Sequence, residues 1–148
     1  MLYFRLPEYN HSVCGLMQVM EPNMMPRHRV LLVEDDADTL QLMRLVLSEL
    51  PLDIEPACSG AEAIALIEQA VPELILLDIN LPDMHGWEVL DRFKENARLQ
   101  AARIIVLTSH KDPVHRLIGS LQPITAYLNK PVTADKLRQY VRDALRIP

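Results

Sequence analysis

Short apolar runs alternate with longer amphipathic stretches along the chain from residue 29 onward. Most of the runs consist of leucine and β-branched side chains, a pattern that is typical of strands buried on both faces of a parallel sheet. The stretches between them place apolar residues three and four positions apart, which predicts amphipathic helices. We predict strands at residues 30–33, 53–57, 74–77, 104–107 and 124–128, and helices at about residues 37–50, 60–72, 87–96, 114–121 and 137–145.

This alternation predicts one doubly wound α/β domain over residues 29–148. Right-handed crossovers leave few ways to arrange such units, and the commonest is a five-stranded parallel sheet of strand order 2-1-3-4-5. The expected fold is therefore flavodoxin-like, with helices on both faces of the sheet. Its polar site is expected just beyond the carboxyl ends of the strands, where ligands bind in open sheets of this kind.

Residues 1–28 carry no sustained period and are interrupted by three prolines. We interpret them as a flexible N-terminal arm or as the product of a wrongly assigned start, because Met20, Met24 and Met25 could each begin the chain. A helix that docks on a partner is the less favoured interpretation of this segment.

The formal net charge of −5 argues against a protein that binds nucleic acid directly, since phosphate contacts need clustered Lys and Arg. No apolar run approaches the roughly 20 residues of a membrane span, and no signal peptide is evident, so we expect a cytoplasmic protein without membrane attachment. Cys14 and Cys58 lack metal-ligand spacing. We expect both to be reduced, with Cys58 in the core.

Polar side chains follow four of the predicted strands at the edge where ligands are expected. They are Glu34, Asp35, Asp36, Asp78, Thr108 and Lys130. Three carboxylates, Asp35, Asp36 and Asp78, would repel one another there unless a cation intervened, and Mg²⁺ prefers such oxygen ligands. A lysine and a hydroxyl beside them suit phosphoryl oxygens, so the set has what phosphoryl transfer to an aspartate requires.

The chain from residue 29 to residue 148 resembles the receiver domains of two-component response regulators, in their stand-alone form. The resemblance is carried by VLLVEDD, LILLDINLPDMHGWEVL, IIVLTSH and AYLNKPV, in the order and spacing of the family. It implies that Asp78 accepts a phosphoryl group from a sensor histidine kinase or a histidine phosphotransfer protein. It also implies that Asp36 binds Mg²⁺ directly, that Asp35 helps partly through water, and that the backbone carbonyl of Asn80 completes the protein ligands.

The resemblance further implies that Lys130 pairs with the Asp78 carboxylate and that Lys130 and Pro131 are joined by a cis peptide. Thr108 and Tyr127 would form the switch pair, which couples the phosphoryl group to a surface that binds a downstream protein. Such a domain is a signalling module rather than a turnover enzyme, and loses its phosphoryl group by slow autodephosphorylation. The sequence names neither the kinase nor the downstream partner, and leaves open a homodimer formed through the last helix.

Each of these residues also has a plainer interpretation. Asp35 and Asp36 are well suited to cap the first helix, Thr108 to end a strand, and Tyr127 to pack as a strand residue. Among functions, a receiver used as a phosphorylation-independent scaffold is one alternative. A phosphatase of the haloacid dehalogenase type is disfavoured because Asn80 stands where its second aspartate would be, and a nucleotide-binding domain because no glycine-rich phosphate loop exists.

Overall fold

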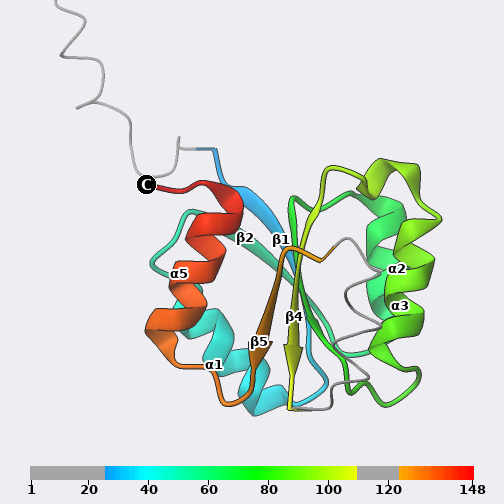
Figure 1. Ribbon diagram of the computed structural model, residues 1–148, viewed down its shortest axis with the longest axis horizontal. Helices are drawn as coiled ribbons and strands as arrows, with labels where there is room; N and C mark the ends of the chain where they lie inside the picture. Colours follow the sequence, from blue (N-terminus) through cyan, green and yellow to red (C-terminus); the bar gives the residue numbers. More distant parts are fainter. Residues whose placement is uncertain (1–25, 110–123) are drawn as a thin grey trace, which may run out of the picture.

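A computed structural model describes residues 26–109 and 124–148 of the chain. A single five-stranded parallel sheet of strand order β2-β1-β3-β4-β5 runs through its centre (Figure 1). Its strands are β1 (His28–Val33), β2 (Leu52–Ala57), β3 (Leu74–Asp78), β4 (Arg103–Thr108) and β5 (Ala126–Asn129). The predicted doubly wound order is therefore confirmed.

Helices cover both faces of this sheet (Figure 1). The helices are α1 (Ala37–Leu47), α2 (Gly60–Gln69), α3 (Gly86–Lys94) and α5 (Ala134–Leu145), with a short 3₁₀ helix, η2 (Ala97–Leu99), after α3. Helices α1 and α5 pack on one face, and α2 and α3 on the other. The helix predicted at residues 114–121 lies outside the described residues. Within the described part of the chain, no helix has the length and apolar character needed to span a membrane.

The alternation of side chains in β1 explains the two core clusters. Val30 and Leu32 pack with the buried residues of α1 and α5, whereas Leu31 and Val33 pack with those of α2 and α3. All five residues of β3 and the last four of β1 are buried, so neither strand turns these residues toward solvent. Burying one such leucine or valine stabilises the fold by about 2 kcal/mol. Because β1 and β3 are packed in the core in this way, the residues at their carboxyl ends are held in fixed positions.

Several boundaries differ from the predicted ones. Strand β1 begins at His28, because its N–H donates to Pro51 O at 2.9 Å and residue 28 pairs in register with Leu52. The first strand therefore begins before residue 29, while the division of the chain into arm and domain stays a prediction. Helix α1 ends at Leu47 rather than residue 50, since Ser48 bonds back to the carbonyl of Leu45 through both its N–H and its hydroxyl.

The prediction that Cys58 belongs to the core is wrong. Strand β2 ends at Ala57, and Cys58 is the next residue, where its side chain is exposed as a free thiol. Its N–H donates to Glu62 Oε2 at 2.7 Å at the start of α2. Cys58 is therefore part of a strand-to-helix connection, and Cys14 lies outside the described residues.

Candidate functional site

Three carboxylates meet at the carboxyl end of the two central strands. Glu34 and Asp35 directly follow β1, and Asp78 is the last residue of β3. Because β1 and β3 are parallel neighbours with Val33 opposite Leu77, these side chains emerge at the same edge of the sheet. One oxygen from each of the three lies within 4.8 Å of the others, which makes the set a candidate metal site. We call Glu34, Asp35 and Asp78 the acidic cluster.

Lys130 provides the positive charge beside the acidic cluster. Its Nζ atom donates to Glu34 Oε2 at 2.6 Å and to Asp78 Oδ2 at 2.8 Å. The lysine follows β5, and its backbone N–H donates to Thr108 O at 2.8 Å, which fixes it at this edge. The peptide bond between Lys130 and Pro131 is cis, as predicted. One ammonium group therefore bridges two carboxylates whose residues are only 1% and 4% exposed.

Burial and mutual contact set the charges of these groups. Burial raises the pKa of Glu34, and the hydrogen bond from Lys130 opposes that rise. Burial also disfavours the ammonium form of Lys130, but the hydrogen bonds and charges of Asp78 and Glu34 outweigh it, so the pKa of Lys130 is raised. Lys130 is therefore cationic, and it places one positive charge beside three carboxyl groups, a set of oxygen atoms that suits a hard divalent cation.

Asp36 lies outside the acidic cluster. It is the N-cap of α1, and its Oδ1 accepts a hydrogen bond from Thr39 N at 2.7 Å. Hydrogen bonds from the side chain and the backbone of Thr39 lower the pKa of Asp36. The direct contact of Asp36 with a metal ion stays a prediction. Glu34, rather than Asp36, joins Asp35 and Asp78 in the acidic cluster, because the N–H of Glu34 still pairs with Ala57 O at 3.0 Å and so continues the β1–β2 pairing by one residue.

The other predicted residues lie at the same edge. Thr108 is buried at the end of β4, beside β3. Asn80 stands two residues after β3: its backbone N–H donates to Asp78 Oδ1 at 3.0 Å and its side-chain amide to Ser109 Oγ at 3.2 Å. Sequence reasoning named Glu34 without giving it a role. The uninterrupted apolar run before Glu34 was the available signal, because the first polar residue after a buried strand shares its burial.

Tyr127, the predicted switch aromatic, is half-buried in β5 and packs against the core cluster of α2 and α3. Its hydroxyl is fully buried and, among the described residues, has no hydrogen-bond partner. This burial raises the pKa of Tyr127. An unsatisfied buried hydroxyl costs about 1–3 kcal/mol, so the present position of the ring is energetically unfavourable at that one atom.

Tyr127→Phe is accordingly expected to stabilise the fold by about 1 kcal/mol, because it removes the unsatisfied hydroxyl and keeps the ring. Urea unfolding followed by circular dichroism measures the change. Tyr140→Phe is the matched control, since Tyr140 is half-buried on α5 and its hydroxyl is not a buried unsatisfied group. A clear loss of stability in Tyr127→Phe alone would show that the hydroxyl has a bonding partner in solution.

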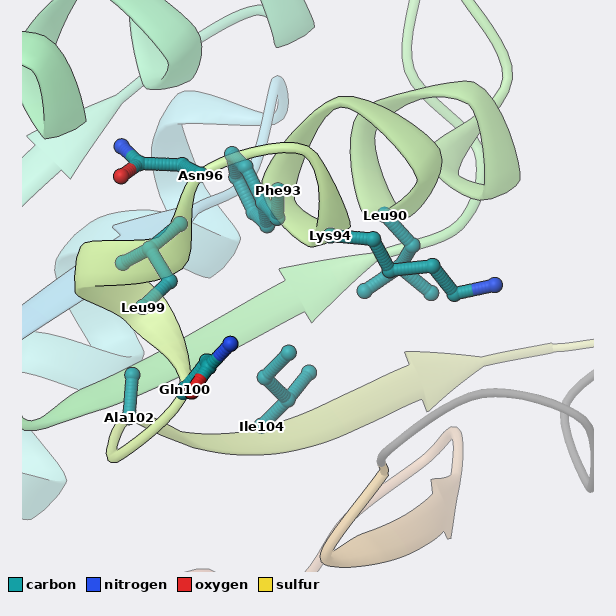
Figure 2. Close-up of a pocket in the computed structure, with 8 residues that line it drawn as sticks. All are labelled: Leu90, Phe93, Lys94, Asn96, Leu99, Gln100, Ala102 and Ile104. Carbon is teal, nitrogen blue, oxygen red and sulfur yellow. The ribbon is translucent and has the colours of Figure 1, made fainter.

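Two hollows lie near the sheet. One, of about 200 Å³, opens between α3, η2 and β4 (Figure 2), and none of its lining residues belongs to the acidic cluster. Its lining is mostly apolar and consists of Leu90, Phe93, Lys94, Asn96, Leu99, Gln100, Ala102 and Ile104. The other, of about 560 Å³, lies between α1 and α5 and reaches Lys130. Only the second adjoins the acidic cluster, so the first has no part in its chemistry.

The sequence is similar to a known domain family and to several known proteins. The model of the response regulator receiver domain matches residues 30–142. The transcriptional regulatory protein TrcR of Mycobacterium tuberculosis is 33% identical over 118 residues, which cover 80% of this chain and 45% of TrcR. The regulatory protein LuxO of Vibrio cholerae is 36% identical over 115 residues, which cover 78% of this chain and 25% of LuxO. The chain thus spans less than half the length of these two relatives.

A solved signal receiver domain from Vibrio parahaemolyticus has the same architecture. It superposes with a TM-score of 0.76 at 34% sequence identity, and the match covers 82% of this chain and 92% of that one. The similarity therefore extends over most of this chain and nearly all of that domain.

Proposed function

The chain belongs to the response regulator receiver domain family, and from this premise we propose that it is the phosphoacceptor of a two-component phosphorelay. Receiver domains of this family pair with histidine kinases. In the proposal, Asp78 receives a phosphoryl group from the phosphohistidine of a kinase or of a phosphotransfer protein. The observation that carries the proposal is the contact of Lys130 with the buried carboxylates of Glu34 and Asp78, beside the third carboxylate, Asp35, which follows β1.

The transfer step follows from the position of Asp78. One of its carboxylate oxygens forms a bond to phosphorus while the bond between phosphorus and the donor histidine nitrogen breaks, and the electron pair of that bond returns to the imidazole. Asp78 is held for this attack by two contacts, Asn80 N on Oδ1 and Lys130 Nζ on Oδ2. Such chemistry depends chiefly on positioning and on neutralising charge, which these contacts supply.

The acidic cluster would hold Mg²⁺ through oxygens of Glu34, Asp35 and Asp78, with the backbone carbonyl of Asn80 as a further ligand. When bound, the ion would neutralise negative charge on the phosphoryl oxygens. Lys130 would bond to the phosphoryl group from the other side, as a compact positive charge suits an anionic oxygen.

Phosphorylation would then change a partner-binding surface. The added charge of about −1.5 to −2 draws donors toward Asp78, and the Thr108 hydroxyl is the proposed donor, because Thr108 ends β4, the strand that pairs with β3. Tyr127, on the adjacent β5, would move with Thr108. Its buried hydroxyl, which has no partner among the described residues, is a cost that a movement of the ring would relieve. The downstream partner would read that change.

The position of Asp36 leads to a prediction that separates metal binding from helix capping. Asp35→Ala is expected to raise the half-saturating Mg²⁺ concentration at least about tenfold, because it removes a carboxylate from the acidic cluster. Asp36→Ala is expected to leave Mg²⁺ affinity within about twofold while lowering thermal stability, because it removes the cap of α1. Isothermal titration calorimetry with Mg²⁺ and thermal unfolding measure both. Loss of Mg²⁺ binding in Asp36→Ala alone would instead support Asp36 as the direct ligand.

The direct test of the proposed function is the intact mass of the wild-type protein after incubation with a small-molecule phosphodonor. We expect the mass of a single phosphoryl group to be added with Mg²⁺ and not with a chelator, in a linkage that is stable to acid and labile to base. The same assay with a phosphorylated histidine phosphotransfer protein covers donors that act only by specific contact. A folded protein that accepts nothing from either donor would favour the phosphorylation-independent scaffold.

A further inference from the structure

The first turn of α2 satisfies part of its own hydrogen-bonding requirement. The early N–H groups of a helix have no partner within the helix. Ser59, the N-cap, accepts from Glu62 N with its hydroxyl at 3.1 Å and from Ala63 N with its carbonyl at 3.1 Å. The N–H groups of Gly60 and Ala61 receive no acceptor from this local cap.

A residue from a different segment supplies those two acceptors. Asp83, in the loop between β3 and α3, accepts from Gly60 N with Oδ1 and from Ala61 N with Oδ2, both at 2.9 Å. These hydrogen bonds, first from Ala61 and then from Gly60, lower the pKa of Asp83. The carboxylate is therefore charged at neutral pH and lies at the positive end of the α2 dipole. The loop is thus held to α2 by an ionised side chain with both of its oxygens engaged.

The same loop packs closely on α2 beside Asp83. A Cβ atom on Gly60 would lie 2.4 Å from Met84 Cγ, so the helix can begin there only with glycine while Met84 keeps its place. At its base the loop is closed by an antiparallel bridge between Asn80 and His85. The loop is therefore anchored at its base by backbone pairing and at its outer end by Asp83 and Met84.

This loop also determines the position of groups in the acidic cluster. Asn80, at the base of the loop, donates its N–H to Asp78 Oδ1 at 3.0 Å, so the backbone of the loop orients the acceptor carboxylate. The carbonyl of Asn80 belongs to the same short segment. A change in the path of residues 80–85 would therefore move both the Asp78 oxygen and the proposed carbonyl ligand.

We propose that Asp83 is a positioning residue for phosphoryl transfer: by capping α2 across the β3–α3 loop, it holds Asn80 and Asp78 in the arrangement that Mg²⁺ binding and transfer require. This inference rests on the proposed function of Asp78. Asp83 itself touches neither the donor nor the metal ion in this account. It acts through the backbone of the loop, as supporting groups around metal sites do.

The test compares two substitutions at the same helix end. Asp83→Ala removes the cap that spans the loop, whereas Ser59→Ala removes the cap that lies within the α2 segment and leaves the loop contact in place. We expect Asp83→Ala to raise the half-saturating Mg²⁺ concentration about tenfold and to slow labelling by a small-molecule phosphodonor by a similar factor. Ser59→Ala is expected to lower stability and to change both quantities less than about twofold.

Amide hydrogen exchange of Asn80 gives a readout that does not depend on phosphoryl transfer. Its N–H should exchange about tenfold faster in Asp83→Ala than in the wild type and at the wild-type rate in Ser59→Ala. Asp83→Asn keeps one acceptor oxygen but loses the charge, so its Asn80 N–H should exchange at a rate between those of Asp83→Ala and Ser59→Ala. This variant replaces Asp83→Ala if Asp83→Ala does not fold. Equal Mg²⁺ affinity and equal exchange in Asp83→Ala and Ser59→Ala would overturn the inference.

These outcomes separate the inference from the proposed function. If the wild type is labelled and Asp83→Ala behaves like the wild type, the proposed function stands and the positioning role falls. If the wild type is never labelled, the proposed function falls, and the exchange rate of Asn80 still decides whether Asp83 holds the loop.

Discussion

Asp78→Asn is expected to abolish phosphoryl labelling while leaving the fold intact. Asparagine has almost the same shape as aspartate, and its amide oxygen can still accept the N–H of Asn80. An amide oxygen is uncharged and a far weaker nucleophile than a carboxylate, so no acyl phosphate forms. The variant also removes one of the three charges of the acidic cluster, and Lys130 keeps its contact with Glu34. We therefore expect a normal circular dichroism spectrum together with no added mass.

The matched control is Asp53→Asn, the same chemical change at an exposed residue of β2. It should be labelled to the same extent as the wild type under the same Mg²⁺ and donor concentrations. Undiminished labelling of Asp78→Asn would refute Asp78 as the acceptor. Labelling of neither the variant nor the wild type would instead bear on the function as a whole.

Lys130→Met is expected to lower the free energy of unfolding by about 3 kcal/mol in the presence of a chelator. Methionine keeps much of the apolar stem of the lysine but leaves Glu34 and Asp78, both nearly inaccessible to solvent, without their cation. Removing one partner from a buried ion pair is costly because the remaining charge stays desolvated. Millimolar Mg²⁺ should restore part of the loss, since the ion neutralises the same carboxylates.

Urea unfolding with chelator and with Mg²⁺ measures this effect, and Lys136→Met, at an exposed position in the first turn of α5, is the control. In the functional assay, Lys130→Met should slow phosphoryl transfer more than it weakens Mg²⁺ binding, because Lys130 contacts oxygen atoms and is not itself a metal ligand. Unchanged stability in the chelator would show that Lys130 does not hold the two carboxylates in their charged form.

The strand order and the edge that carries the polar residues could be predicted from the sequence because both follow from local patterns. Runs such as LILL specify a buried strand, and Asp78 stands directly at its end. That Glu34 rather than Asp36 joins the acidic cluster could not be predicted in this way. Both carboxylates follow the same run, and the difference depends on whether β1 pairs with β2 for one residue more, which is a tertiary contact.

The contact of Asp83 with α2 is a second tertiary contact that the local sequence does not predict. Nothing in the loop sequence around it indicates an acceptor for the N–H groups of Gly60 and Ala61, which lie 23 and 22 residues earlier in the chain. The exposure of Cys58 likewise depends on where β2 ends: the strand ends at Ala57, one residue before the cysteine. Local spacing predicts which elements form, whereas contacts between connections depend on how those elements are packed.

The two outer strands affect how copies of this chain can associate. Strand β2, at one edge of the sheet, carries Asp53, Glu55 and Pro56, and the proline has no N–H to offer a further strand. Strand β5, at the other edge, is four residues long. Charge, proline and shortness are the usual features that prevent edge-to-edge pairing and aggregation. Self-association of this domain would therefore use its helical faces, and its sheet is protected from growing into a continuous intermolecular one.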